Sequence, residues 1–266
     1  MIEILGYAAA IIIGISLGLI GGGGSILTVP ILVYLLGISP VMSTAYSLFI
    51  VGGSSLVGVI NYARKGLVDY KTALAFGLPS LIAVFVTRKF IVPAIPENIF
   101  SVAEFTMTKG MFLMVLFAIL MLVASVGMIK KKKEKTAEEH KSIKPWQTML
   151  IVLIEGAVVG TLTGLVGAGG GFLIIPALVL FAGLEMKRAI GTSLIIIAVK
   201  SLVGFTGDMS NYVIDWQFLL AFTGMAVIGI FIGSFLATKI DGQKLKVGFG
   251  WFVLVMGAFI LLKELI

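Results

Sequence analysis

Long stretches without a charged side chain are the feature that most constrains this chain. No Asp, Glu, Lys, Arg or His occurs between Ile4 and Ala63. Four later runs share this property: Thr72–Thr87, Met111–Ile129, Gln217–Thr238 and Val247–Leu262. A helix needs about 20 apolar residues to cross about 30 Å of hydrocarbon. Only helices and closed barrels pair all their backbone groups there, and unbroken rather than alternating apolar runs indicate helices. The sequence therefore predicts an all-α polytopic membrane protein.

The overall composition agrees with a membrane protein and disagrees with a water-soluble one. Charged residues make up 12% of the chain, whereas soluble domains average about 25%. The net charge is +7. Membrane proteins concentrate Lys and Arg in cytoplasmic loops, so this excess does not indicate nucleic-acid binding.

The apolar runs divide into full spans and shorter segments. Full spans are predicted near residues 4–20, 41–61, 70–88, 109–129, 146–165, 188–206, 215–238 and 245–263. Two shorter segments are predicted near residues 26–36 and 172–182. Eleven helical residues rise only about 16 Å, roughly half the membrane.

The chain repeats itself with a shift of 146 residues, and we call residues 146 apart repeat mates. GLIGGGGSILTVPILVYLLG at Gly18–Gly37 matches GLVGAGGGFLIIPALVLFAG at Gly164–Gly183. About 21 of the 59 pairs from residue 18 to residue 76 are identical, which indicates a duplication. We predict a first membrane repeat at 1–129, a charged linker at 130–145 and a second membrane repeat at 146–266.

The basic residues predict which ends face the cytoplasm. The linker contains seven Lys and should be cytoplasmic. If the segment 172–182 completes a crossing, Lys187 and Arg188 are also cytoplasmic, and the loop 208–215 lies outside. A re-entrant segment would reverse these assignments. The crossing arrangement gives about five helical elements per half and hence two inverted halves, a common transporter architecture. Arg88 and Lys89 do not fit it.

Glycine runs interrupt the apolar sequence before each short segment. Glycine tolerates unusual backbone conformations and close approach of a ligand. A helix that starts after such a break presents unpaired N–H groups to an anion. We predict that two such starts face each other near the midplane and bind an anion through Gly22, Gly23, Gly24, Ser25, Gly169, Gly170 and Gly171. The alternative is close helix packing through small residues. No phosphate-loop Lys follows either run, which argues against nucleotide binding.

Polar residues in the next span of each half form a second candidate cluster. Ser47 and Ser193 are repeat mates, and Thr192 and Lys200 lie in the same span as Ser193. Lys200 would neutralise a bound oxyanion while the hydroxyls donate hydrogen bonds, because a charge within a span is costly and usually functional. The alternatives are snorkelling of Lys200 toward the interface and bonding of the hydroxyls within or between helices.

Three acidic residues have assigned roles. Glu155 is the only acid deep within a span; it could take up a coupling proton, or it could pair with Lys200. Asp69 and Asp215 are repeat mates at the starts of spans, and Asp is a favoured helix N-cap.

Several chemistries are excluded by missing residue types. There is no Cys, and the single His, His140, lies in the linker. Thiolate chemistry, Cys or His metal clusters and a His base inside the membrane are therefore ruled out, and neither a metal nor a cofactor is expected. No H-E-x-x-H motif or paired intramembrane Asp supports an enzyme.

The repeated motifs resemble the sulfite exporter TauE/SafE family of membrane permeases. The resemblance rests on three features: the duplicated glycine motif (G-x-x-G-x-G-G-G in the second copy) with a following Pro, then TAYSL or GTSL, then SLVG. It covers nearly the whole chain. It maps the family's glycine segments onto 21–25 and 167–171, and its small-polar segments onto 44–48 and 191–194. The first copy has Ala45-Tyr46 where the second has Gly191-Thr192, so the two copies need not contact the substrate equally.

The resemblance implies a secondary transporter of the bacterial inner membrane. Its expected substrate is a small sulfur-containing oxyanion such as sulfite, thiosulfate or sulfoacetate, moved by alternating access and coupled to a proton or sodium ion. Its expected surroundings are the lipid bilayer, with no nucleic acid. The alternative function is a non-transporting membrane component that binds an anion or a partner protein. The choice of anion, the direction of transport and the oligomeric state stay open at this point.

Overall fold

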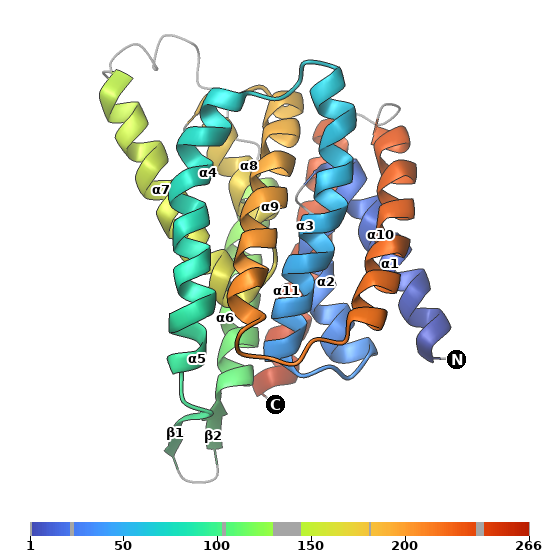
Figure 1. Cartoon of the computed structure of the whole chain (residues 1–266), viewed down its shortest axis with the longest axis vertical. Helices are drawn as coiled ribbons and strands as arrows, with labels where there is room; N and C mark the ends of the chain where they lie inside the picture. Colours follow the sequence, from blue (N-terminus) through green and yellow to red (C-terminus); the bar gives the residue numbers. More distant parts are fainter. Residues whose placement is uncertain are drawn as a thin grey trace.

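Long helices run side by side along the long axis of the molecule (Figure 1). This computed structural model describes residues 2–21, 24–102, 105–129, 145–180, 182–237 and 242–265. Apart from Pro145, the predicted linker 130–145 lies outside the described residues, as do the candidate site residues Gly22 and Gly23.

Every predicted span and both short segments coincide with helices. The first half contains α1 (Ile2–Ile20), α2 (Ser25–Pro30) with a π-helical continuation (Ile31–Leu35), α3 (Pro40–Arg64), α4 (Tyr70–Val86) with a π-helical continuation (Thr87–Ile91), α5 (Val92–Ala94) and α6 (Lys109–Ile129). The second half contains α7 (Pro145–Val166), α8 (Gly171–Leu180), α9 (Met186–Asp208), α10 (Trp216–Ala237) and α11 (Gly242–Leu265). The all-α prediction is confirmed.

A small β-hairpin between α5 and α6 was not predicted. Its antiparallel strands are β1 (Asn98–Val102) and β2 (Phe105–Thr108). β2 alternates apolar residues with Thr, and β1 is rich in aromatic and β-branched residues, which favour strands. The hairpin projects from one end of the bundle (Figure 1), so it adds to the membrane architecture without changing it.

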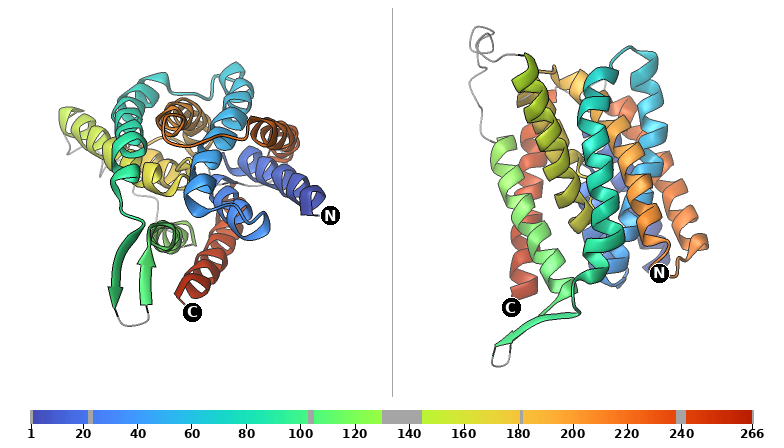
Figure 2. Two further views of the ribbon diagram at one scale, coloured as in Figure 1. Left: turned by 60° about the horizontal axis from the view of Figure 1, so that its bottom comes forward. Right: turned by 60° about the vertical axis from the view of Figure 1, so that its left-hand side comes forward.

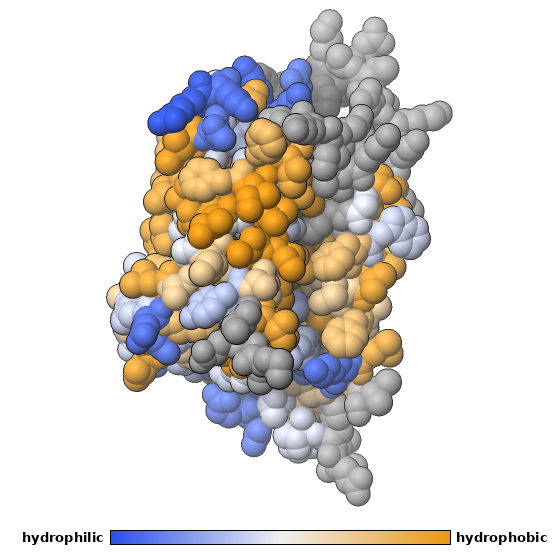
Figure 3. Space-filling model, turned by 90° about the vertical axis from the view of Figure 1, so that its right-hand side faces the viewer, coloured by the Kyte–Doolittle hydropathy of each residue, from blue (hydrophilic) through white to orange (hydrophobic). Residues whose placement is uncertain are grey.

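The surface of the bundle is the surface of a membrane protein. Within the described residues, five helices are long and apolar enough to cross a membrane: α3, α4 with its extension to Ala94, α6, α9 and α10. Large apolar side chains such as Leu74 and Phe235, each 62% exposed, point outward from these helices. Figure 3 shows an apolar band between hydrophilic ends on one face. The chain is therefore a multi-pass membrane protein.

The two halves make equivalent contacts. α1 packs against α10, and α7, which contains the repeat mates of α1, packs against α4, which contains those of α10. α1 and α7 lie at opposite edges of the bundle (Figure 2). Hydrogen bonds repeat in the same way: the Asp69 N–H donates to Thr192 Oγ1, and the Asp215 N–H donates to the hydroxyl of Tyr46, each at 2.9 Å. The 146-residue register thus relates contacts as well as sequence.

Both predicted N-caps are confirmed. The Asp69 carboxylate accepts a hydrogen bond from the Thr72 N–H at 2.8 Å, and Asp215 accepts one from the Phe218 N–H at 3.0 Å. Each bond satisfies one of the backbone donors that a helix start leaves unpaired. The long helices α4 and α10 therefore begin at fixed residues.

Small residues let α1 approach α10 closely. A Cβ atom on Gly14 would lie 1.9 Å from the carbonyl oxygen of Ala226, and one on Gly229 would lie 2.1 Å from the carbonyl oxygen of Ile11. Glycine pairs of this kind are a common basis of helix association in membranes. Glycines outside the two glycine runs therefore serve helix packing.

Candidate functional site

The helix starts that follow the two glycine runs lie next to each other in the middle of the bundle. A Cβ atom on Gly169 would lie 3.4 Å from Cβ of Ser25, at the start of α2. It would also lie 2.6 Å from Cγ1 of Val51, midway along α3. The starts of α2 and α8 are therefore neighbours at mid-depth.

The second turn has a backbone that only glycine adopts easily. Gly167, Gly169 and Gly170 have φ angles of +67°, +62° and +74°. A Cβ atom on Gly170 would also lie 2.0 Å from Cγ2 of Thr163, so two constraints exclude a side chain there.

α8 begins at Gly171. The N–H groups of Leu173 and Ile174 donate to the Gly170 carbonyl. In the described part of the chain, the unpaired donors that this helix start leaves are therefore those of Gly171 and Phe172. This helix start is therefore suited to an anion.

Lys200 lies directly beside this turn. Its side chain is buried, with 1% of the residue exposed, and its ammonium donates to Thr163 Oγ1 at 2.8 Å. Its Nζ would be 2.8 Å from a Cβ atom on Gly170. The snorkelling alternative is therefore wrong. In the described part of the chain, ion pairs join Arg88 to Asp208 and Lys109 to Glu97, so Lys200 has no carboxylate partner there.

Glu155 lies away from the glycine turns and does not pair with Lys200. It precedes Thr163 by eight residues on α7, a rise of about 12 Å. Its Oε2 atom is buried and has no hydrogen-bond partner among the described residues. A buried acidic group without such a partner is compatible with the predicted coupling role.

A buried ion pair that the sequence analysis missed lies on the other side of the second turn. The guanidinium of Arg88 is 2.7 Å from Asp208 Oδ2, and both side chains are fully buried. Its Nη1 donates to Thr44 Oγ1 at 3.0 Å and to the Gly164 carbonyl at 3.2 Å. Its Nη2 is buried without a partner among the described residues. Arg88 therefore links the π-helical continuation of α4 to α3, α7 and α9.

The sequence contained one indication of this ion pair: Arg88 did not fit the predicted topology. A basic residue that contradicts the charge bias of the loops is expected to be paired inside the protein, because a buried charge needs compensation. Its partner, Asp208, is 120 residues away and was assigned to an outer loop. Only the packing of α4 against α9 shows that the two residues meet.

The predicted hydroxyls have different roles. Ser47 is buried and its Oγ has no partner in the described residues; it lies on the face of α3 that also carries Thr44 and Val51, which contact the second turn. Ser193 donates to the Ile190 carbonyl at 2.8 Å, the back-bonding alternative. Thr192 accepts the bond from the Asp69 backbone. Of these three hydroxyls, the one on Ser47 has no protein partner in the described residues.

The cluster that the fold brings together is thus smaller than the predicted one. It contains Ser25, Gly169, Gly170, Gly171 and Lys200, with Ser47 on the adjoining face of α3. Gly24 caps α2 with a helical φ of −68°, unlike its repeat mate Gly170. Thr192, Ser193 and Glu155 lie outside this cluster.

Positive charge surrounds only the second turn. The repeat mates of Lys200, Arg88 and Thr163 are Ser54, Ser234 and Leu17. The sequence around the first turn therefore has no cation at either of the matching positions, although its glycine motif is similar. This asymmetry favours α8 over α2 as the helix start that attracts an anion, while contact of either turn with a substrate stays a prediction.

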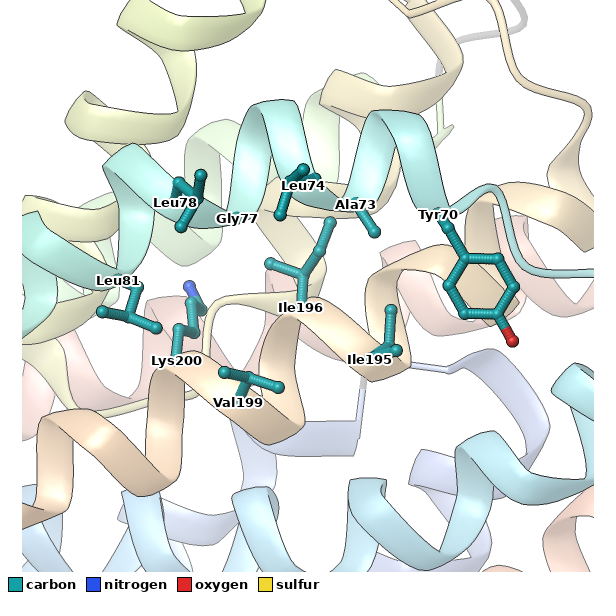
Figure 4. A pocket seen from close by; sticks show the side chains of 10 residues that line it. All are labelled: Tyr70, Ala73, Leu74, Gly77, Leu78, Leu81, Ile195, Ile196, Val199 and Lys200. Atoms are coloured by element: carbon teal, nitrogen blue, oxygen red, sulfur yellow. The ribbon is translucent and has the colours of Figure 1, made fainter.

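A groove between α4 and α9 reaches Lys200 (Figure 4). Its volume is about 340 Å³. Its other lining residues are Tyr70 and the small or apolar residues Ala73, Leu74, Gly77, Leu78, Leu81, Ile195, Ile196 and Val199. The groove therefore connects the apolar outer surface with the buried ammonium.

Known proteins similar to this chain are named as probable membrane transporters. A family model described as "Sulfite exporter TauE/SafE" matches residues 6–260. A probable membrane transporter protein of Xylella fastidiosa is 29% identical over 95% of this chain and 92% of its own length. The probable membrane transporter protein YunE of Bacillus subtilis is 26% identical over 91% of this chain and 92% of its own length. No solved structure matches.

Proposed function

We propose that this chain, which belongs to the sulfite exporter TauE/SafE family, is a secondary transporter that moves a small sulfur-containing oxyanion across the bacterial inner membrane by alternating access. Membership of the family and the names of its relatives support a membrane transporter. The substrate class, the mechanism and the coupling are our proposals, as are the inner-membrane location and the cytoplasmic linker.

The observation that carries the proposal is the buried ammonium of Lys200 beside the start of α8. A cation in an apolar interior is costly unless an opposite charge compensates it. Among the described residues it has only the Thr163 hydroxyl, while the N–H groups of Gly171 and Phe172, at the start of α8, have no backbone partner there. An anion bound there would compensate the charge and accept the backbone hydrogen bonds at once.

The proposed alternating access rests on two inverted halves, and the arrangement of the helices supports that prediction. In Figure 1, α1 starts near the lower end of the bundle and α7 near the upper end. The repeated contacts between α1 and α10 and between α7 and α4 fit two halves exchanged by a pseudo-two-fold axis. Rocking of such halves about a central site exposes the site to each side in turn.

Transport assays on purified protein in proteoliposomes test the proposal. We expect saturable flux of labelled sulfite, thiosulfate or sulfoacetate under a proton or sodium gradient. Lys200→Met should lower that flux at least about tenfold, because a charge-assisted hydrogen bond contributes about 1.5–3 kcal/mol. Lys89→Met, which removes an exposed cation, is the matched control. Saturable binding without flux would favour the alternative of a non-transporting anion-binding component.

Coupling through Glu155 is a separate part of the proposal. If Glu155 carries the proton, Glu155→Gln should abolish accumulation driven by a proton gradient and leave anion exchange at equilibrium intact. The measurement compares gradient-driven uptake with counterflow in the same proteoliposomes. Uptake that still follows the proton gradient in this variant would exclude Glu155 as the coupling group.

A further inference from the structure

The groove between α4 and α9 has the form of a ligand site rather than of a packing defect. Its volume of about 340 Å³ falls within the range of about 300–1,000 Å³ that is usual for small-molecule pockets. Apolar side chains line it along most of its length, and the one ammonium, that of Lys200, lies at its inner end. In Figure 4 this amine points from α9 toward α4, beside Leu78 and Leu81.

The groove exists because two residues of α4 are small. Ala73 and Gly77 line it, whereas their repeat mates on α10 are Leu219 and Thr223. In the equivalent interface a methyl group of Thr223 would be 3.1 Å from a Cβ atom on Gly53, and Leu219 is fully buried. A Cβ atom on Gly77 would meet nothing closer than Ile196, at 3.8 Å. Space is therefore present at one of two otherwise related interfaces.

The outer part of the groove faces the lipid. Tyr70 and Leu74 are each 62% exposed, Leu78 is 53% exposed and Val199 is 47% exposed. These side chains lie on helices of membrane-spanning length, so their exposed surface contacts hydrocarbon. A molecule could therefore enter sideways from the bilayer and reach Lys200 without crossing a polar barrier.

We propose that this groove binds the apolar tail of an amphipathic anion that enters from the bilayer, with its acid group on Lys200. The inference rests on the proposed anion site at Lys200 and adds a ligand class to it: an acid anion with an unbranched alkyl chain. The alkyl chain of a neutral lipid would contact the same apolar side chains but would leave the positive charge of Lys200 uncompensated. The buried charge at the inner end therefore selects an acid.

Equilibrium binding of alkanesulfonates to the full-length protein in nanodiscs tests this inference. The probes are methane-, butane- and octanesulfonate, measured by competition against labelled octanesulfonate, with octanol as the uncharged control. We expect affinity to rise about two- to fourfold per methylene up to the length of the groove, since each buried methylene contributes about 0.8 kcal/mol. Octanol should not compete.

Two substitutions that fill the groove make the test specific. Gly77→Leu and, independently, Ala73→Leu should remove the dependence of affinity on chain length. Gly224→Leu is the matched control: a side chain there meets nothing within 4 Å, and it adds the same apolar surface on α10. It should keep the dependence.

The outcomes separate this inference from the proposed function. Methanesulfonate binding that requires Lys200, with no effect of chain length, would overturn the groove and leave the anion site standing. A chain-length effect of equal size in the wild type, Gly77→Leu and Ala73→Leu would show that probes only partition into lipid, and would overturn the groove as well. Failure of every sulfonate to bind would overturn this inference, and flux of labelled sulfite or thiosulfate would then test the proposed function independently.

Discussion

Two buried cations, Arg88 and Lys200, contact consecutive residues near the C-terminal end of α7. Their other neighbours indicate different roles. Arg88 donates to the Gly164 carbonyl, and Lys200 donates to the Thr163 hydroxyl. The end of a helix carries partial negative charge, which favours both cations. Arg88 also has the carboxylate of Asp208, whereas Lys200 has no carboxylate in the described residues. We therefore interpret Arg88 as a residue that stabilises the fold, an anchor between helices, and Lys200 as the residue that would bind the proposed anion.

Removal of Arg88 should be far more damaging than removal of Lys200. Arg88→Met leaves the Asp208 carboxylate buried alone, and breaking a buried pair in this way costs about 3–5 kcal/mol. The double variant Arg88→Met/Asp208→Leu should recover much of that loss, while Lys200→Met should not lower the melting temperature. Thermal unfolding of the purified variants in detergent gives the comparison. Equal melting temperatures for the single and double Arg88 variants would contradict the anchor role.

At the scale of elements, the proposed site depends on a helical hairpin. It consists of α7, the glycine turn and α8. The positive φ angles allow the chain to reverse at mid-depth, and the absence of side chains lets Lys200 and Thr163 approach the backbone. A broken helix inside a membrane is tolerated where it is buried in protein or lines a cavity. The turn meets this condition, since Gly169, Gly170 and Gly171 are buried.

Substitution of Gly170 by Ala tests this hairpin against a matched control. Gly170 and Gly183 have similar φ angles of +74° and +66°. A side chain on Gly170 would collide with Thr163, whereas one on Gly183 would meet nothing within 4 Å. Gly183→Ala should therefore cost only the backbone penalty of about 1–2 kcal/mol, and Gly170→Ala should cost clearly more and abolish anion flux. Equal losses of thermal stability would refute the steric argument.

At the scale of the whole molecule, the direction of each helix determines at which end of the bundle the loops between described helices lie. Lys65 lies in the loop between α3 and α4, at the end of the bundle where α7 starts, and Val213 lies in the loop between α9 and α10, at the opposite end (Figure 1). If the linker is cytoplasmic, Lys65 faces the cytoplasm and Val213 faces the outside.

Single-cysteine labelling tests this orientation directly, because the chain contains no Cys. Both positions are exposed, Val213 with 94% of its surface accessible. In intact cells, an impermeant maleimide should label Val213→Cys and spare Lys65→Cys until the membrane is opened. Labelling of Lys65→Cys alone in intact cells would reverse the orientation, and labelling of both would contradict opposite sides.

The sequence determined the helices, their limits and the register of the duplication, because each depends on neighbouring residues: an apolar run of sufficient length, an Asp before a helix, a glycine run that repeats after 146 residues. Only the tertiary structure decided which polar groups meet. Arg88 pairs with Asp208, whereas Glu155 does not pair with Lys200. The Thr192 hydroxyl accepts a hydrogen bond from the Asp69 backbone, and a groove lies beside Gly77. The physical reason is that compensation of a buried charge depends on distances across helices that lie far apart in the chain. Those distances follow from packing, and no local pattern encodes them.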